Sequence, residues 1–429
     1  KDWKHHTVYA AKKMALGELR AAAAHLIPAW YLAPTQSYPL LKRAELFANL
    51  GMWPEVVRET GRCLGLSKKA NLHSSRRPSM AQVRTSHIES SARFLRAQAF
   101  ARIHPPEFLN SLVDLDILAK KVAQNFDKSL LVRVLVERAK AKLGIVANMS
   151  NCNPEREATL DWARDDIEWA VEKAKNCSGH SISKLWASIL CTLIQVSFEL
   201  YSIKGDITQL DYMAGTINSA IHESGFREVF IIERVANVYL TTKEYQGGRK
   251  AMLALEGILQ DLVRSKGAPA QTQCVTESSK TESRDQRSSG QHVDGKLLEL
   301  LVESLKQQGR IAAACKDYSA SIKCFKDALS LSESDHLLPC MMAEVWNLSG
   351  DSESALQLLY SKPLRGSAPA HYQASFQLVY SITLAQTGSA NEAIREFSKL
   401  LQTPRLWGWL TLTQRAMVRT QLAILYMDW

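Results

Sequence analysis

Few residue groups in this sequence have the types and spacing that catalysis or metal binding requires. The 11 histidines are scattered, and the one adjacent pair, His5-His6, would point to different sides of a helix. The 8 cysteines form no C-x-x-C pair, and no phosphate-binding glycine loop, serine-nucleophile elbow or zinc-protease motif occurs. We therefore predict a protein that is not an enzyme, with no metal site and no cofactor.

The most concentrated charged feature is a basic segment at residues 67–82. This stretch is polar and short of large apolar residues, so we predict a loop. It carries four cations, Lys68, Lys69, Arg76 and Arg77. Arg76-Arg77-Pro78-Ser79 fits a basic-basic-x-Ser pattern, which makes Ser79 a possible phosphorylation site whose negative charge would lie beside these cations. A solvated loop is the usual role of such a segment, and phosphate binding is the alternative.

The charge excess is local. The chain of 429 residues has 53 Lys and Arg against 43 Asp and Glu, a formal net charge of +10. Residues 1–82 hold 13 basic and 5 acidic residues, so +8 lies in the first fifth of the chain. The remaining residues are almost neutral, and the total charge gives no general argument for nucleic-acid binding.

The composition predicts a large folded chain. Hydrophobic residues make up 46% of it, which excludes disorder throughout. The densest apolar stretch, Leu185 to Phe198, is short and interrupted by polar residues, so we expect no membrane span. No N-terminal segment resembles a secretory signal, and the cysteines lack pairing motifs. These features favour a reducing, intracellular compartment, most simply the cytoplasm.

Helical periodicity runs through nearly the whole chain. Apolar residues recur at 3.6-residue spacing, for example in 153–176, whereas alternation with period two is rare. Residues 265–294 contain no Leu, Ile, Met or aromatic residue and cannot bury enough surface to offset their ordering entropy. The sequence therefore predicts an all-α fold with a helical block at 1–264, a flexible polar insertion at 265–294 and a second helical block at 295–429.

A repeat of about 34 residues organises the C-terminal block. Second helices begin near Tyr318, Ser352 and Ala390, which are 34 and 38 residues apart, and each follows a first helix of similar length. A single hairpin of this size cannot bury its own apolar stripe, so neighbouring hairpins must stack. Small residues such as Ala343 would let the stacked backbones approach. The spacing predicts an α-solenoid in two blocks.

These hairpins resemble the tetratricopeptide repeat (TPR), and the nearest match is the stretch from Lys316 to Ser334. In that family the first helix carries a small residue followed three positions later by an aromatic residue, and the second helix carries Ala, an aromatic residue and Ala. The C-terminal residues that fit are Ala343, Trp346, Tyr318, Phe325 and Ala328. Looser matches in the N-terminal block are Ala44, Phe47, Gly51 and Trp53, and Ala236, Tyr239, Tyr245 and Gly248.

The resemblance implies a groove lined by the first helices, on the face opposite the small residues. The residues expected there are Leu337, Cys340, Glu344, Leu378 and Ile382. Because this face is more apolar than charged, it favours a partner helix or an extended peptide. The alternative is that the same residues pack against the chain's own neighbouring helices.

We interpret the sequence as a non-catalytic scaffold or adaptor that binds other protein subunits through the concave surface of a TPR-like solenoid, as part of a larger assembly. The alternative is an RNA-associated helical-repeat protein that uses the basic N-terminal segment. Basic side chains gathered on the concave face would favour this alternative. RNA is the less favoured partner, because the excess cations are expected in a loop.

Overall fold

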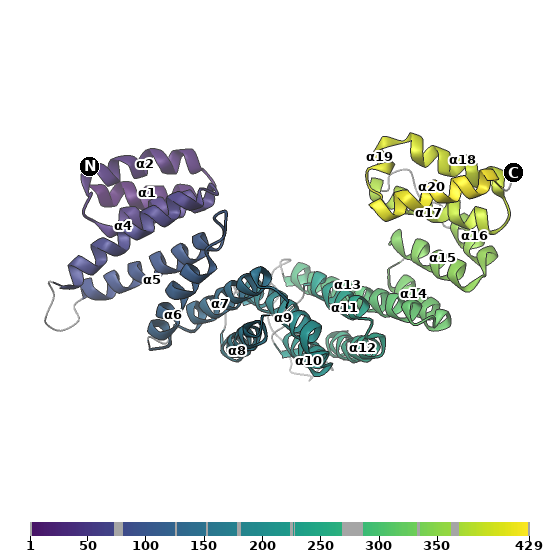
Figure 1. Cartoon of the computed structure of the whole chain (residues 1–429), viewed down its shortest axis with the longest axis horizontal. Helices are drawn as coiled ribbons and strands as arrows, with labels where there is room; N and C mark the ends of the chain where they lie inside the picture. Colours follow the sequence, from purple (N-terminus) through teal and green to yellow (C-terminus); the bar gives the residue numbers. More distant parts are fainter. Residues whose placement is uncertain are drawn as a thin grey trace, which may run out of the picture. The chain divides into compact units, whose positions relative to one another are not determined.

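Helices form all the regular structure in the described part of the chain. The computed structural model describes residues 2–427 except 73–79, 125–126, 152, 178–181, 224–225, 227, 268–285, 333–334 and 362–368. Within these residues there are 20 helices and no strand, which confirms the predicted all-α class (Figure 1).

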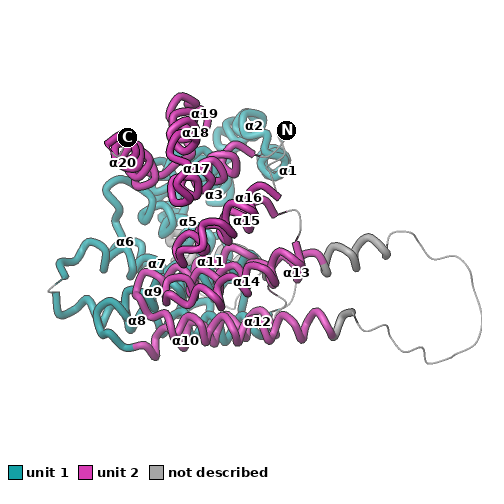
Figure 2. The backbone as a smooth tube through the Cα atoms, turned by 90° about the vertical axis from the view of Figure 1, so that its right-hand side faces the viewer, with its two compact units in different colours: residues 1–206 teal, residues 207–429 magenta. Residues whose placement is uncertain are grey.

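The helices fall into two compact units, residues 1–206 and residues 207–429 (Figure 2). Unit 1 contains α1 (Trp3–Ala15), α2 (Leu19–Leu32), α3 (Ser37–Asn49), α4 (Trp53–Leu72), α5 (Met80–Phe100), α6 (Phe108–Gln124), α7 (Lys128–Asn148), α8 (Glu155–Lys175) and α9 (Ile182–Lys204). Unit 2 contains α10 (Thr208–Glu223), α11 (Phe230–Thr242), α12 (Tyr245–Gly267), α13 (Gln286–Ala314), α14 (Tyr318–Leu331), α15 (Leu337–Ser349), α16 (Ser352–Ser361), α17 (Ala370–Gln386), α18 (Ala390–Gln402), α19 (Pro404–Trp407) and α20 (Leu412–Met427).

Each unit is a stack of helical hairpins. Consecutive helices pack against each other, as α1 does with α2, α7 with α8 and α13 with α14. Several helices also contact the next helix but one, as between α1 and α3 or α7 and α9 in unit 1, and between α11 and α13 or α15 and α17 in unit 2. Repeat proteins produce this pattern because each hairpin contacts only its neighbours. The predicted α-solenoid of TPR-like hairpins is therefore confirmed within each unit.

The boundary between the units differs from the boundary predicted at the polar insertion. Helices α12 and α13 lie on either side of the insertion, yet they pack against each other inside unit 2. Residues 265–267 and 286–294 belong to these two helices, and residues 268–285 lie outside the described residues. The insertion therefore interrupts a hairpin of one unit and does not separate the two units, because the helices on its two sides pack against each other.

The basic segment is also more helical than predicted. Helix α4 continues to Leu72 and α5 begins at Met80, so Lys68 and Lys69 are helix residues and not loop residues. Arg76, Arg77 and Ser79 lie outside the described residues.

A recurrent turn defines six of the hairpins. In each, a buried small residue lies seven positions before a residue with a left-handed φ. The six pairs are Ala10 and Gly17, Ala44 and Gly51, Ala236 and Lys243, Gly309 and Lys316, Ala343 and Gly350, and Ser381 and Gly388. In five of these turns the next residue donates its N–H to the carbonyl five positions earlier at 2.9 Å. This is the Schellman end of the first helix, which satisfies a carbonyl that would otherwise lack a partner.

The hairpin of α13 and α14 shows why the small residue is needed. A Cβ at Gly309 would lie 2.6 Å from the ring of Phe325, so only glycine permits this approach of the two helices. Ser321, at a place where the TPR family usually has alanine, donates its hydroxyl to the Gly309 carbonyl at 2.8 Å. The buried hydroxyl is thereby satisfied. Phe325 is 1% exposed and Ala343 is fully buried, as the repeat register predicts.

Helix α9 is the most apolar long helix. The segment Lys184–Lys204 is, among the described residues, the one segment long and apolar enough to cross a membrane, and half of its most apolar window is buried inside the chain. Trp186, Leu190 and Leu193 are each at most 1% exposed. This burial is what a central helix of a helical stack requires.

The left-handed turn residues give a test of the hairpin geometry. Gly350→Ala is expected to lower the free energy of unfolding by about 1–2 kcal/mol, because a Cβ strains this backbone conformation. No atom lies within 4 Å of the added Cβ, so the effect is one of backbone strain alone. Lys316→Gly, at the equivalent position, is expected to be neutral or stabilising. Urea unfolding midpoints measure both changes, and an unaffected Gly350→Ala variant would contradict the assigned turn.

A second test concerns the packing of the repeat. Phe325→Ala is expected to cost about 3–5 kcal/mol, because it leaves a cavity beside Gly309. Ala343→Trp is expected to cost about 1–3 kcal/mol or more by overpacking the contact between helices. Thermal unfolding measures both, with Leu348→Ala, at a 64% exposed position, as a control of little effect. Unchanged melting temperatures would show that the repeat register is wrong.

Candidate partner-binding surfaces

The five residues predicted to line a groove lie on two neighbouring helices of unit 2. Leu337, Cys340 and Glu344 belong to α15, and Leu378 and Ile382 belong to α17, which contacts α15. The repeat register therefore brings the expected helices together. Their side chains, however, divide between the core and the surface.

Two of the five residues are core residues. Cys340 and Leu378 are each 2% exposed. Cys340 packs in a cluster with Val379 of α17, and Leu378 packs in a second cluster that contains Phe397 of α18. The prediction that Cys340 and Leu378 are exposed anchors is wrong, because a first helix in this stack is covered by its own hairpin partner and by the next first helix.

The other three residues reach the surface. Leu337 and Ile382 are half-buried, and Glu344 is exposed. Although solvent reaches Glu344, the protein that surrounds it raises the pKa of its carboxyl group, and the positive charge of Arg310 only partly opposes this. Neither solvent nor the neighbouring Arg310 fully compensates the negative charge of ionised Glu344. A cation placed against it from outside would stabilise the ionised form.

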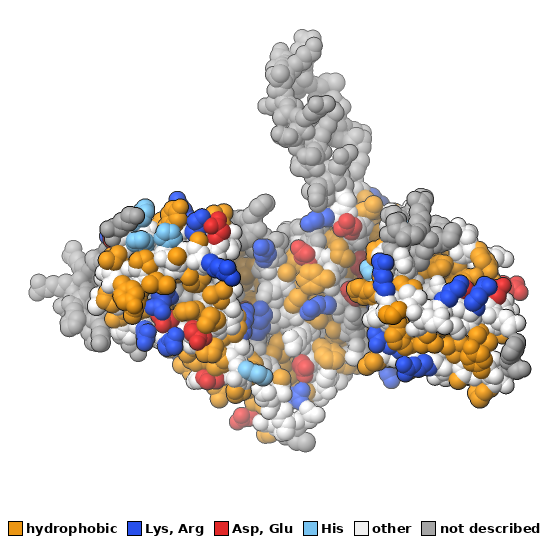
Figure 3. All heavy atoms as spheres, turned by 90° about the horizontal axis from the view of Figure 1, so that it is seen from above, with side chains coloured by type: hydrophobic (Ala, Val, Ile, Leu, Met, Phe, Trp, Pro, Cys, Tyr) orange, Lys and Arg blue, Asp and Glu red, His pale blue; other side chains and the backbone are white. Residues whose placement is uncertain are grey.

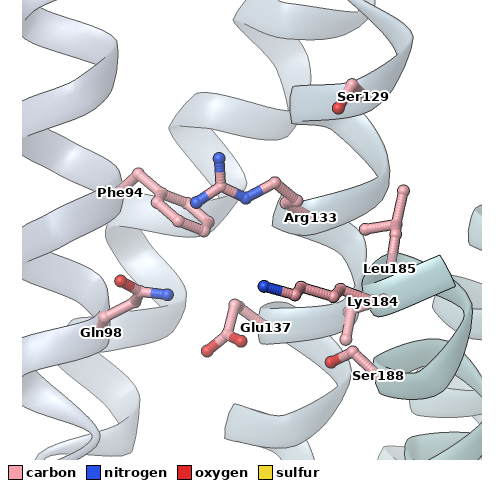
Figure 4. A pocket seen from close by; sticks show the side chains of 9 residues that line it. Phe94, Gln98, Ser129, Arg133, Glu137, Lys184, Leu185 and Ser188 are labelled. Atoms are coloured by element: carbon pink, nitrogen blue, oxygen red, sulfur yellow. The ribbon is translucent and has the colours of Figure 1, made fainter. Parts of the chain in front are cut away.

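Unit 1 contains a hollow that sequence analysis did not identify. Its volume is about 300 Å³, and helices α5, α7 and α9 contribute its walls (Figure 4). The lining residues are Phe94 and Gln98 from α5, Ser129, Arg133, Val136 and Glu137 from α7, and Lys184, Leu185 and Ser188 from α9.

Helical spacing explains how α7 supplies a polar stripe to this hollow. Ser129, Arg133 and Glu137 are four residues apart, so they lie above one another on one face of the helix. The adjacent positions Val132 and Val134 are fully buried and face the core. The same helix therefore holds the stack together with one face and presents charged groups with the other.

Two cations in this hollow form no ion pair with the described part of the chain. The Arg133 guanidinium lies 4.8 Å from the centre of the Phe94 ring, and the Lys184 amine points into the same space (Figure 4). No carboxylate of the described residues forms an ion pair with either. Glu137 is paired instead with Lys140 at 3.0 Å, and Lys140 also donates to the Ser188 hydroxyl at 2.9 Å.

A second hollow of about 500 Å³ adjoins the first, since Gln98 lines both. Arg102 is exposed there and lies 4.9 Å from the centre of the Trp53 ring, again without an acidic partner among the described residues. We call the surface that presents Arg102, Arg133 and Lys184 the cationic groove.

Other cations of unit 1, which lie between its helices, are paired with buried carboxylates. Asp114, with a side chain 2% exposed, accepts a hydrogen bond from Arg96 at 2.6 Å and joins α6 to α5. Asp166 pairs with Arg138 and with Lys142, the latter at 2.8 Å, and joins α8 to α7. Buried carboxylates require such partners. Among the described residues, the cations of the cationic groove neutralise no such buried carboxylate.

The cationic groove escaped sequence analysis because its three cations come from separate parts of the chain. Arg102 lies two residues beyond the end of α5, Arg133 on α7 and Lys184 on α9, and none of the three has an adjacent basic residue in the sequence. The one local signal was the four-residue stripe on α7. The basic segment that the sequence did emphasise is placed elsewhere, on α4 and in residues outside the described part.

Solved structures with related helical arrangements have low overall similarity to the chain. No protein-family model and no curated protein matches it. It is similar to the human IFIT1 dimer with PPP-AAAA (12% identity, TM-score 0.35, covering 99% of this chain and 81% of that one). It is also similar to a tetratricopeptide repeat protein from Parabacteroides merdae (11% identity, TM-score 0.29, covering 73% of this chain and 98% of that one). A third similar structure is yeast Tom70 (11% identity, TM-score 0.26, covering 99% of this chain and 96% of that one). At these TM-scores the TPR-like character rests on the hairpin geometry described above.

Substitutions should separate the surface cations from the structural ion pairs. Arg133→Ala is expected to cost at most about 0.5–1 kcal/mol of stability, since it removes one exposed contact with an aromatic ring. Asp166→Ala is expected to cost about 3–5 kcal/mol, because it leaves Arg138 and Lys142 without their buried partner. Denaturant unfolding measures both. Equal costs would mean that the cationic groove is part of the core.

Proposed function

We propose that this chain is a non-catalytic scaffold or adaptor that binds protein partners on the surfaces of its two hairpin stacks. The observation that carries the proposal is the cationic groove of unit 1, where three cations with no ion-pair partner among the described residues line two adjoining hollows. The buried carboxylates Asp114 and Asp166 are paired with other cations, so the charges of Arg102, Arg133 and Lys184 are available to a partner. Repeat stacks commonly use such extended surfaces for recognition.

The chemistry of the cationic groove favours an acidic, extended protein segment. A guanidinium that stacks on an aromatic ring is held in place while its N–H edges stay available, which suits two-point binding of a carboxylate. Phe94, Val136 and Leu185 provide apolar walls beside Arg133. Apolar side chains of a partner could therefore alternate with its acidic ones.

RNA is the second candidate partner, and the same contacts make it less favoured. Single-stranded RNA binding usually needs exposed aromatic faces on which bases stack. In the cationic groove Arg133 covers Phe94, which is 7% exposed, and Arg102 covers the half-buried Trp53. Phosphates could still bind the cations, but the bases would find no platform there.

Unit 2 would use a different surface. Leu337, Glu344 and Ile382 offer two apolar contacts and one carboxylate whose pKa is raised by its surroundings. A partner segment with a Lys or Arg beside apolar side chains would fit this surface. The two units thus differ in the charge they accept, which supports an adaptor that holds distinct segments.

A reducing, intracellular compartment belongs to the same proposal. The six described cysteines are all free thiols, in line with this setting. Burial raises the pKa of Cys63 and of Cys340 to about 12, so both stay protonated and unreactive.

The decisive experiment reverses the charge of the cationic groove. The double variant Arg133→Glu with Lys184→Glu is expected to bind a fluorescent peptide of alternating Glu and Leu about 100-fold more weakly than the unmodified chain, because two charged hydrogen bonds are lost. Lys120→Glu is the matched control, since it makes the same kind of change at an exposed position of α6. Fluorescence anisotropy measures the affinities, and circular dichroism checks the fold.

The outcomes separate the two candidate partners. Equal binding by the double variant and the control would reject the cationic groove as a peptide site. Binding of single-stranded RNA that exceeds peptide binding, falls steeply with salt and is lost in the double variant would favour the RNA alternative.

A further inference from the structure

The hollow between α5, α7 and α9 collects hydrogen-bond donors that have no partner among the described residues. Arg133 and Lys184 form no ion pair with these residues, and the Gln98 amide and the Ser129 hydroxyl form no hydrogen bond with them. The Gln98 amide and the Lys184 amine point into the hollow from opposite sides (Figure 4). Four donors from three helices therefore line one space of about 300 Å³.

The charged side chains at this hollow leave an excess of two positive charges. Arg133 and Lys184 belong to the lining, and Lys140 beside it donates to the Ser188 hydroxyl at 2.9 Å. Glu137, the carboxylate in the lining, is paired with Lys140 at 3.0 Å. A ligand that brings two negative charges into the hollow would therefore complement both remaining cations.

The hollow differs from an ordinary basic surface. Lys and Arg side chains are spread among hydrophobic side chains on the face of the molecule that Figure 3 shows. In the hollow, by contrast, Arg133 is held against the ring of Phe94, 4.8 Å from its centre, so it loses less conformational freedom when it binds. The neutral donors Gln98 and Ser129 lie in the same hollow and can bind oxygens that the cations leave.

A phosphate monoester has the charge and the acceptors that complement this hollow. It carries about −1.5 to −2 charges near pH 7 and three acceptor oxygens, whereas a carboxylate carries one charge and two oxygens. We propose that the hollow binds a phosphorylated serine or threonine of a protein partner, with Arg133 donating to two phosphate oxygens and Lys184 to the third. This inference rests on the proposed function, because it specifies the acidic segment that the cationic groove binds.

The surroundings favour a phosphorylated protein segment over other sources of phosphate. Val136 and Leu185 line the hollow beside the cations and offer contacts to apolar side chains of such a segment. The adjoining hollow continues the cationic groove to Arg102, where an extended segment can place a further acidic residue. Each phosphodiester of RNA carries a single charge and would leave one of the two cations uncompensated.

The test compares three fluorescent peptides of alternating Glu and Leu that differ at one central position, which holds phosphoserine, glutamate or serine. Fluorescence anisotropy with the full chain is expected to show that the phosphoserine peptide binds about tenfold more tightly than the glutamate peptide, because a second charged contact forms at the same residue. Arg133→Gln and Lys184→Gln are each expected to reduce this preference to about twofold or less. Lys120→Gln, at an exposed position of α6, is the matched control and should retain it.

A further variant tests whether the phosphate lies in this hollow. Glu137→Gln removes the carboxylate of the lining and is expected to tighten binding of the phosphoserine peptide about two- to fivefold, because a like charge is removed. Unchanged or weaker binding by this variant would contradict the proposed position of the phosphate. Circular dichroism checks the fold of every variant.

The outcomes separate this inference from the proposed function. Equal binding of the phosphoserine and glutamate peptides would overturn the phosphate site and leave the acidic-segment site intact, whereas binding of neither would overturn both. A phosphoserine preference that persists in Arg133→Gln and Lys184→Gln would show that the phosphate binds elsewhere. Tighter binding to phosphatidylcholine vesicles that contain phosphatidylinositol phosphate than to the phosphoserine peptide would also overturn the inference, since the ligand would then be a lipid headgroup.

Discussion

The close contact between the two helices of each hairpin is the constraint on which the rest of the structure depends. Gly309 and Phe325 show it most clearly, since any side chain at Gly309 would collide with the aromatic ring. The left-handed residue seven positions later ends the first helix at a fixed distance from this contact. The chain therefore reverses at the same point in each of these hairpins, and the apolar stripes of neighbouring hairpins meet in register.

This stacking also decides which charged side chains are paired with a buried carboxylate and which reach solvent. Where a carboxylate such as Asp114 or Asp166 is enclosed between two helices, arginine and lysine side chains must neutralise it. On the outward face of α5, α7 and α9 no such carboxylate is enclosed among the described residues, and Arg133 rests on Phe94. The same residue types thus neutralise buried carboxylates between some helices and reach solvent on the outward face of others.

Stacking explains why part of the predicted groove in unit 2 lies in the core. The 3.6-residue period correctly placed Cys340 and Leu378 on apolar faces of first helices. Such a helix has two apolar neighbours, its hairpin partner and the next first helix, so its covered arc is wider than that of a single surface helix. Both residues fall inside this arc, whereas Glu344 falls outside it.

The sequence by itself determined the helical class, the repeat near 34 residues and the register that buries Ala343 and Phe325, because these follow from local periodicity and turn chemistry. It could not determine which helix faces are covered, since that depends on neighbours distant in the chain. Tertiary structure alone placed α12 against α13 across the polar insertion and aligned Arg133 with Lys184. It also brought Gln98 into the same hollow, because only the packing of α5, α7 and α9 sets the positions of these side chains relative to one another.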